Sequence, residues 1–600
     1  MKLSRLYTNQ PNLFAPVEFV PGLNVVLAEI RLPENKAKDT HNLGKTTLGR
    51  IIDYCLLAGR DPDFFLFKHF DLFESFVFFL ELDLLNGSLV TIRRGVEEAS
   101  KISFKRHDQR HRDFSDLAEG AWDHAGVPFE RAKELLDGIL DLRDLKGWSY
   151  RKVVGYLLRS QADYREVFQL GKFASAHSDW KPFLAHILGF DSSTIVEHYA
   201  KEDALEGMKA EEGVIEKELG GSIEDISKIE GLKLLKQKEA EKKQRLLDAF
   251  DFRQSDKEKT KALVEDLDTS IARLNAERYS LTQNKKRITS SLQDDEILFD
   301  PASAAELFRQ SGVVFGGQIK RDFEQLITFN RAITDERRGY LTEELAQVEA
   351  ELKQANIDLN TLSKRRTEML SFLSGTDVFI KYKQVTDELV TLKADITSLE
   401  RQRAFLHRLQ ELRAELRRLA EQKQRLQTQI EGDVEKQNSD KESMFSAIRF
   451  VFSEIVDEVI DRQALLSVAP NHSGHLEFKA EILDDSGNAT SADLGFTYRK
   501  LLCIAFDVAL LRAHLDGQFP RFVFHDGAFE SLDDRKKENL LGVMREFARL
   551  GIQHIVTLID SDVPVRPTDG KNTPFFEDSE VVLRLHDEDA SGRLFRMKAW

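Results

Sequence analysis

Hydrophobic and polar positions follow two different patterns along the chain. Near both ends, short apolar runs alternate with stretches that carry apolar residues at helical spacing. Three apolar runs predict buried strands, at residues 25–27, 522–524 and 555–558. Residues 48–57 predict a helix directly after the first of them. Up to about residue 195, and again from about residue 441, the pattern therefore predicts α/β structure.

The central part of the chain has another composition. In residues 196–440, Glu, Lys, Arg, Gln and Leu dominate and proline is nearly absent. Apolar residues recur at alternating steps of four and three, which is the heptad seam of a coiled coil. Three seams are visible, over residues 263–281, 341–373 and 382–430. The pattern predicts long coiled-coil helices, whose charged faces say nothing about function by themselves.

Two breaks interrupt the helical pattern. Residues 300–317 contain a proline and a Gly-Gly pair, and residues 374–377 read Ser-Gly-Thr-Asp, a short helix breaker. The similar lengths of segments 310–373 and 377–440 favour a hairpin at Ser374. Residues 198–295 are then expected to form a second, shorter helical pair.

Composition narrows the class of protein. Charged residues make up 31% of the chain, in agreement with long solvated helices, and the net charge of −16 restricts any DNA contact to a local basic surface. Cys55 and Cys503 lie in apolar stretches and predict buried thiols. No apolar run approaches the length of a membrane span, and residues 1–9 lack the apolar core of a signal peptide. We expect a cytoplasmic protein without membrane contact.

The most specific local signal is Asn42-Leu43-Gly44-Lys45-Thr46-Thr47. It matches the end of a P-loop, G-x-x-x-x-G-K-[ST], whose backbone amides cradle phosphates at a helix N-terminus. Lys45 would reach the β- and γ-phosphates of ATP, and the Thr46 hydroxyl would bind Mg²⁺. The first glycine of the motif is absent because Asp39 stands there, but a predicted strand precedes the loop and a predicted helix follows it.

A second signal lies in the C-terminal part. Residues 522–526 read Phe-Val-Phe-His-Asp, an apolar strand that ends in a carboxylate, as in a Walker B strand. Asp526 is therefore predicted to support Mg²⁺ together with Thr46 and to serve catalysis. Residues 531–533 read Ser-Leu-Asp, which resembles the D-loop of ABC-class ATPases and makes Asp533 a candidate nucleotide contact.

The P-loop, the helical insert, the Walker B strand and the D-loop occur in an order that resembles the SMC, RecN and double-strand-break-repair ATPases. Gly22-Leu23-Asn24-Val25 also resembles the strand that opens their heads. A closer resemblance is to a family of SMC-like bacterial proteins of unknown function found in ABC-three-component defence-associated systems. The matching residues are 42–47, 51–55, 498–503, 506–507 and 525–527.

This resemblance implies an ABC-type (SMC-like) P-loop ATPase head interrupted by a long antiparallel coiled coil. Residues 1–195 and 441–600 would be its N- and C-terminal lobes, and residues 196–440 the insert. Its cofactors would be ATP and Mg²⁺, held between the heads of a homodimer. DNA and a separately encoded effector would be further partners, in defence against phages or plasmids. A zinc hook is excluded, because no Cys-x-x-Cys occurs.

Two departures concern catalysis. ABC-class ATPases carry a water-positioning glutamate after the Walker B aspartate, but here Gly527 follows Asp526. Glu530 is the nearby carboxylate and a candidate replacement. The switch histidine is also missing after the strand predicted over residues 555–558, where Asp560 and Ser561 stand instead.

Two further positions are open to more than one interpretation. The signature sequence Leu-Ser-Gly-Gly is absent, and residues 493–500 occupy its place at a predicted helix start. Gly495 there would still meet a γ-phosphate across a dimer. Gln161 resembles the Q-loop glutamine of SMC heads, although a surface glutamine would equally explain it.

These residues support three functions to different degrees. A working SMC-type ATPase that senses or handles DNA is the first, with a RecN-type DNA-repair ATPase as its variant. A hydrolysis-poor ATP-binding switch or scaffold is the second, which Gly527 and the missing switch histidine favour. A coiled-coil structural protein without nucleotide is the third, and it leaves the paired Walker motifs unexplained. No metal-ligand cluster or nucleophile constellation favours a nuclease or a protease.

Overall fold

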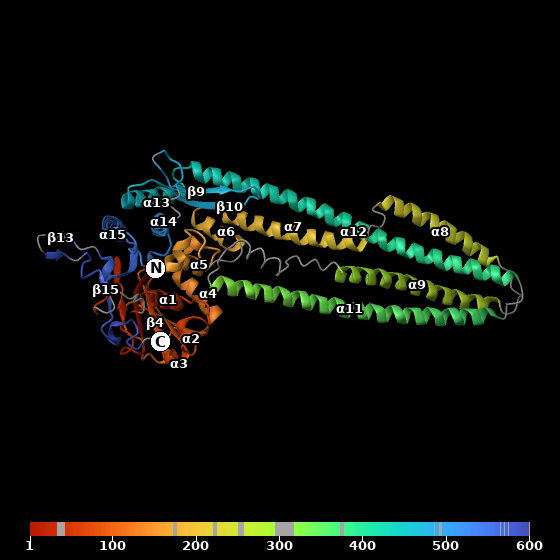
Figure 1. Cartoon of the computed structure of the whole chain (residues 1–600), viewed down its shortest axis with the longest axis horizontal. Helices are drawn as coiled ribbons and strands as arrows, with labels where there is room; N and C mark the ends of the chain where they lie inside the picture. Colours follow the sequence, from red (N-terminus) through yellow and green to blue (C-terminus); the bar gives the residue numbers. More distant parts are fainter. Residues whose placement is uncertain are drawn as a thin grey trace. The chain divides into compact units, whose positions relative to one another are not determined.

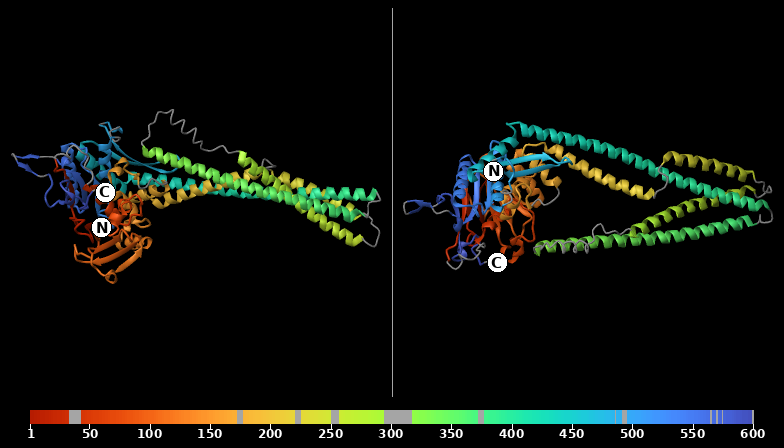
Figure 2. Two further views of the ribbon diagram at one scale, coloured as in Figure 1. Left: turned by 60° about the horizontal axis from the view of Figure 1, so that its bottom comes forward. Right: turned by 45° about the horizontal axis from the view of Figure 1, so that its top comes forward.

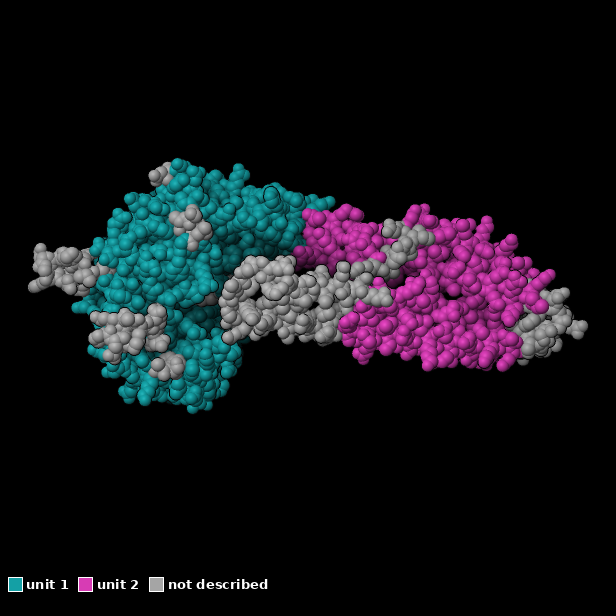
Figure 3. Space-filling view, in the orientation of Figure 1, with its two compact units in different colours: residues 1–202, 421–600 teal, residues 203–420 magenta. Residues whose placement is uncertain are grey.

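The computed structural model describes residues 1–32, 43–171, 177–219, 225–249, 257–293, 317–371, 377–484, 486–490, 495–563, 566–568, 571–573 and 575–598. The chain divides into two compact units (Figure 3). Met1–Glu202 and Glu421–Trp600 form the first, called here the head unit, and Asp203–Ala420 form the second, the helical unit. The predicted fold class is confirmed, since the two ends of the sequence build one α/β unit and long helices interrupt it.

A parallel sheet at the centre of the head unit draws its strands from both ends of the chain. Its order is β15-β3-β12-β11-β8, and all four pairings are parallel. The strands are β3 (Leu23–Glu29), β8 (Leu158–Arg159), β11 (Phe522–Asp526), β12 (Gln553–Ile559) and β15 (Val581–His586). Every residue of β11 is buried, as expected for a parallel sheet covered on both faces.

An antiparallel sheet of six strands, in the order β2-β1-β4-β5-β6-β7, forms the other part of the N-terminal lobe. Its strands are β1 (Lys2–Thr8), β2 (Val17–Glu18), β4 (Val77–Asp83), β5 (Leu89–Gly95), β6 (Lys101–His107) and β7 (His124–Pro128). Two small antiparallel pairs complete the strands, namely β9 (Ala464–Pro470) with β10 (Leu476–Ile482) and β13 (Arg566–Thr568) with β14 (Lys571–Thr573).

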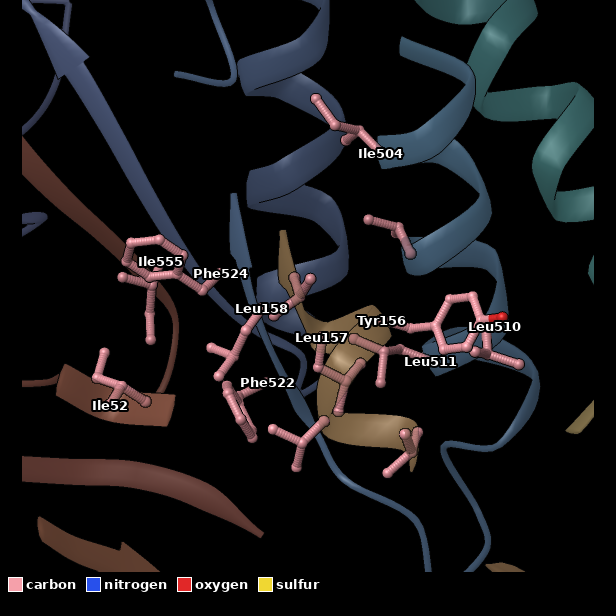
Figure 4. Packing of buried hydrophobic residues seen from close by; sticks show 14 of the residues in the cluster. Ile52, Tyr156, Leu157, Leu158, Ile504, Leu510, Leu511, Phe522, Phe524 and Ile555 are labelled. Atoms are coloured by element: carbon pink, nitrogen blue, oxygen red, sulfur yellow. The ribbon is translucent and has the colours of Figure 1, made fainter. Parts of the chain in front are cut away.

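Helices from both lobes pack on these sheets (Figure 1). They are α1 (Lys45–Cys55), α2 (Phe65–Lys68), α3 (Phe70–Phe73), α4 (Phe129–Leu140), α5 (Tyr150–Leu157), α6 (His177–Ile187), α13 (Met444–Ile460), α14 (Phe496–Ala513) and α15 (Asp534–Arg549). Figure 4 shows Ile52 of α1 and Leu158 of β8 near Phe524 of β11 in the buried core. A Cβ on Gly49 of α1 would lie 2.6 Å from Phe524, so glycine lets the helix approach the strand closely.

The helical unit contains long helices with narrow apolar seams. Its elements are α7 (Ser192–Leu219), α8 (Ile226–Asp248), α9 (Lys257–Gln293), α11 (Gly317–Ser371) and α12 (Asp377–Ser439), of which α7 and α12 also extend into the head unit. The end of α12 belongs to the head unit because Ile430 and Val434 join the core of that unit. None of the described helices is both long and apolar enough to cross a membrane.

The pairing of these helices differs from the prediction. Segments 310–373 and 377–440 were expected to pair along their length, but α11 packs along α9, as the two views in Figure 2 also show. Antiparallel ion pairs join these two helices, from Lys285 to Glu349 at 2.7 Å and from Arg366 to Asp268 at 2.8 Å.

Within the helical unit, α12 contacts α7 and α8 and shares apolar clusters with α9. Arg413 of α12 lies 2.6 Å from Glu212 of α7, and Asp395 of α12 lies 2.8 Å from Lys236 of α8. Contact between α11 and α12 includes the pair Arg366–Asp387, close in sequence to the reversal. Ser374 itself, like most of the break at residues 300–317, lies outside the described residues.

Candidate nucleotide-binding site

The start of α1 has the backbone geometry of an anion site. Gly44 adopts the left-handed conformation with φ of 105°, and a Cβ there would lie 2.6 Å from the Cβ of Leu594. Glycine is therefore required on both counts. Leu43 is buried, and its carbonyl accepts a hydrogen bond from Leu594 N at 3.0 Å. Gly44 has no side chain that could cap α1, and the first amides of a helix lack partners within the helix, so they are suited to an anion.

Lys45 is the first residue of α1 and is buried with an exposed fraction of 5%. Among the described residues, its Nζ has no hydrogen-bond partner. A buried ammonium group is costly unless an anion accompanies it. The unpaired cation at an uncapped helix start therefore fits phosphate oxygens. Thr47 follows in the first turn of the same helix, whereas Asn42 lies outside the described residues.

The structure brings Thr46 and Asp526 together although they are 480 positions apart. The Thr46 hydroxyl donates to Asp526 Oδ2 at 2.6 Å, and the Thr557 hydroxyl donates to Asp526 Oδ1 at 2.5 Å. Asp526 is fully buried while Thr46 is exposed. A hydroxyl and a carboxylate that meet beside a solvent-accessible position are the oxygen ligands that Mg²⁺ uses, and they fit this ion. Thr557 on β12 carried no signal in the sequence.

Glu530 follows β11 at the carboxyl edge of the parallel sheet, the same edge at which the predicted P-loop follows β3. Gln161 Nε2 donates to both of its carboxylate oxygens, at 2.9 and 3.1 Å. Gln161 itself opens a short 3₁₀ helix directly after β8, and Ser160 and Asp163 cap that helix reciprocally. The candidate replacement for the missing glutamate and the Q-loop candidate are thus direct neighbours.

Lys500 is a site residue that the sequence did not reveal. It lies one turn into α14, is 1% exposed, and donates to the carbonyls of Gly527 at 2.8 Å and Glu530 at 3.3 Å. Its Nζ is 3.7 Å from the Glu530 carboxylate. Burial lowers the pKa of Lys500, and the Glu530 charge opposes that shift. In the sequence, Lys500 lay within the segments 493–500 and 498–503 and was given no role of its own.

Burial raises the pKa of the Glu530 carboxyl, and the positive charges of Lys500 and Lys45 oppose the shift. Asp562 adds a negative charge that raises this pKa further. Its Oδ2 is buried and has no hydrogen-bond partner within the described part of the chain. Asp562 is two residues beyond Asp560, at the place where the sequence lacks a switch histidine. It is a second site residue that sequence reasoning missed.

The two remaining candidates lie at helix starts. Gly495 is the N-cap of α14, which confirms the helix start predicted there, and no side chain caps it within the described residues. Phe496, the first residue of α14, is 51% exposed. Asp533 caps α15 by accepting from Lys536 N at 3.0 Å, and its pKa is lowered by the hydrogen bond from the Lys536 side chain. Within one chain, Asp533 thus has a structural partner already.

A buried ionic network connects the elements around the site. Arg159 donates to Asp507 Oδ2 at 2.6 Å and to Oδ1 at 2.9 Å, and His525 Nε2 lies 3.1 Å from Oδ2. All three side chains are fully buried. The network ties β8, which precedes Gln161, to α14 and to the Walker B strand β11. His525, although it adjoins Asp526, is thereby engaged by Asp507, and burial lowers its pKa.

Comparisons with known proteins concern the C-terminal lobe and the fold. Residues 455–599 match the model of a family described as an uncharacterised protein conserved in bacteria, DUF2326. The sequence matches no curated protein.

Among solved structures, the chain is similar to the Smc head domain with a coiled coil and joint from Pyrococcus yayanosii, at 14% identity and a TM-score of 0.35 over 95% of this chain and 96% of that one. It is also similar to the Smc head domain with an extended coiled coil bound to the C-terminal domain of ScpA from Pyrococcus furiosus, at 12% identity and a TM-score of 0.30, over 95% and 94%. The SMC head domain from Thermotoga maritima matches 25% of this chain and 51% of its own, at 15% identity and a TM-score of 0.15.

Proposed function

We propose that the head unit binds ATP with Mg²⁺ and works as an SMC-type ATPase. The observation that carries this proposal is the Lys45 ammonium group, which is buried at the start of α1 and has no hydrogen-bond partner among the described residues. The contact of Thr46 with Asp526 adds the expected Mg²⁺ ligands beside it. Leu43, Gly44 and Thr47 would line the phosphate position through their backbone or first-turn groups. When bound, Mg²⁺ would neutralise phosphate charge at this place.

Lys45→Ala tests the proposal by isothermal titration calorimetry with MgATP. The variant should lose ATP binding by at least about 100-fold, since the charge-assisted contact of the buried Lys45 ammonium group to phosphate disappears. Lys101→Ala is the matched control, because Lys101 is exposed on β6 and pairs only with Glu98. Wild-type protein that fails to bind ATP, or equal affinity of Lys45→Ala and wild type, would refute the proposed function.

We further propose that two copies engage through their heads, with Gly495 and the start of α14 of one copy near the nucleotide of the other. Support comes from the uncapped α14 start and from the exposed Phe496 beside it, which leave amides and an apolar ring available to a second surface. Asp533 would stand at the same boundary. Sedimentation velocity should then show a dimer that depends on ATP.

DNA sensing or handling, an antiviral or anti-plasmid role and a separately encoded effector complete the proposal. They are supported by the resemblance of residues 42–47 and 498–503 to SMC-like proteins of defence-associated systems. Stimulation of ATP turnover by double-stranded DNA would test the DNA part. A RecN-type repair role predicts the same stimulation and differs in its cellular phenotype.

The second candidate is a hydrolysis-poor ATP switch, which Gly527 favours because it offers no side chain after the Walker B aspartate. In that case, purified protein should bind ATP tightly and turn it over at no more than the rate of the Lys45→Ala variant. The working-ATPase proposal predicts turnover that depends on Lys45. One steady-state assay of ATP turnover therefore distinguishes the two functions.

A further inference from the structure

The Glu530 carboxylate occupies the space where a side chain of residue 527 would lie. Gly527 has φ of +67°, and a Cβ built on it would lie 2.7 Å from Glu530 Cδ and Oε1 and 2.8 Å from Oε2. These distances are far below van der Waals contact. Residue 527 must therefore lack a side chain for the Glu530 carboxylate to lie at this position.

Backbone contacts fix the turn that places Glu530 there. Gly527 N donates to the Thr557 hydroxyl at 3.0 Å, and that hydroxyl donates to Asp526. On the other side, Lys500 holds the carbonyls of Gly527 and Glu530. The turn is thus anchored to β12 and to α14, and both anchors lie next to the predicted Mg²⁺ ligand Asp526.

The Glu530 carboxylate lies within range of the Lys45 charge, and its side chain keeps 22% of its surface exposed. Gln161 donates to both carboxylate oxygens and orients the group. Burial raises the pKa of Glu530 above the usual value of a glutamate. A raised pKa brings a carboxylate closer to neutral pH, where a general base is most effective.

We propose that Glu530 takes the place of the missing glutamate and activates the attacking water during ATP hydrolysis. This inference rests on the proposed function, since it needs ATP at the P-loop. The water oxygen forms a bond to the γ-phosphorus while the bond from that phosphorus to the β,γ-bridging oxygen breaks and ADP leaves. The water proton passes to the Glu530 carboxylate and from there to the released phosphate or to solvent.

Glu530→Gln is the decisive variant, because it keeps the size of the side chain and removes its basicity. We expect kcat for ATP to fall by at least about 100-fold, in the range measured for general bases, while the Kd for ATP changes less than about threefold. Asp534→Asn is the matched control, since Asp534 is a mostly exposed carboxylate four residues away at the start of α15. It should leave kcat and Kd unchanged.

The pH dependence of kcat separates a catalytic from a structural role. A base works deprotonated, so wild-type turnover should rise with pH through the raised pKa of Glu530 and then level off. The residual turnover of Glu530→Gln should lack this rise. A purely structural carboxylate would lower kcat in the variant without removing the pH-dependent limb.

Each outcome decides the inference. Unchanged kcat in Glu530→Gln, or wild-type protein that binds ATP without turning it over, would overturn the role of Glu530 and leave the ATP site standing. Absence of ATP binding by the wild type would instead overturn the proposed function. If circular dichroism shows that Glu530→Gln does not fold, Glu530→Asp is tested in its place. Asp keeps the negative charge, but its shorter side chain moves the carboxylate away from the attacking water. It should lose at least about tenfold in kcat.

Discussion

The two units of the protein are stabilised in different ways. The head unit has a large apolar core, built from both ends of the sequence, with a fully buried ion pair, and a small second cluster around Tyr7 and Phe79. The helical unit has several small apolar clusters, such as Ile271, Leu359 and Val390, flanked by exposed ion pairs. The head unit thus contains a fully buried ion pair, whereas most of the ion pairs described in the helical unit are exposed to solvent. Substitutions of paired charged residues should therefore lower the free energy of unfolding more in the head unit than in the helical unit.

The largest effect on stability is expected from Asp507→Asn. The change leaves the Arg159 guanidinium fully buried without a counter-charge, and breaking such pairs costs about 3–5 kcal/mol of unfolding free energy. Urea unfolding measures this loss. Asp516→Asn, at an exposed position after α14, is the control and should be neutral. A loss of unfolding free energy below about 1 kcal/mol for Asp507→Asn would contradict the proposed difference in how the two units are stabilised.

An intermediate effect, dependent on pH, is expected in the helical unit. Asp268 is half-buried beside Arg366, which also pairs with Asp387, and burial raises the pKa of Asp268 to about 6 from 3.8. A carboxyl group whose pKa is higher in the folded state stabilises most when protonated. Stability is therefore lost as pH rises from about 4 to about 6, by up to about 2 kcal/mol.

Asp268→Asn removes this titration, so the variant should lack the decline in stability that the wild type shows between pH 4 and pH 6. Urea unfolding followed by the helical circular dichroism signal at several pH values measures the difference. Asp266→Asn, at an exposed position of the same helix, should retain the decline. Identical pH profiles of Asp268→Asn and wild type would contradict the raised pKa.

The smallest effect is expected for the exposed pairs of the helical unit. Arg413→Ala breaks the contacts of Arg413 with Glu212 and Glu216, but its side chain is 46% exposed. Exposed pairs contribute about 0.2–1 kcal/mol, and salt screens them. The loss should therefore stay below about 1 kcal/mol and shrink in high salt. A loss as large as that of Asp507→Asn would mean that the two units do not differ as described.

Local patterns in the sequence predicted the elements better than their partners. The apolar run at residues 522–526 predicted a strand, and the motif around Lys45 predicted a phosphate-binding helix. Both predictions were possible because each signal lies within a few consecutive residues. The heptad seams of the helical unit predicted helices but not which helices pack together, because every seam has the same period. Hence α12 was assigned to α11 along its length, although it meets α11 close to the reversal and packs elsewhere with α7, α8 and α9.

Site residues were found only where a motif names them. Thr46 and Asp526 were predicted to meet, and they do. Lys500 and Asp562 were missed because their approach depends on α14 and on the chain after β12, which no short motif describes. The Arg159–Asp507 pair joins positions 348 residues apart and needs the tertiary structure to be seen. Glu530 was noticed as a nearby carboxylate, but its position over Gly527 follows from the turn that Lys500 and Thr557 anchor.

Hydrogen exchange with and without MgATP tests the central claim, that nucleotide binds at the start of α1, most directly. In the wild type, peptides that cover residues 43–57 should exchange more slowly when MgATP is present, because phosphate oxygens would accept from the free amides of the α1 start. In Lys45→Ala the same peptides should show no change. Wild-type peptides without added protection, or equal protection in the variant, would contradict the account.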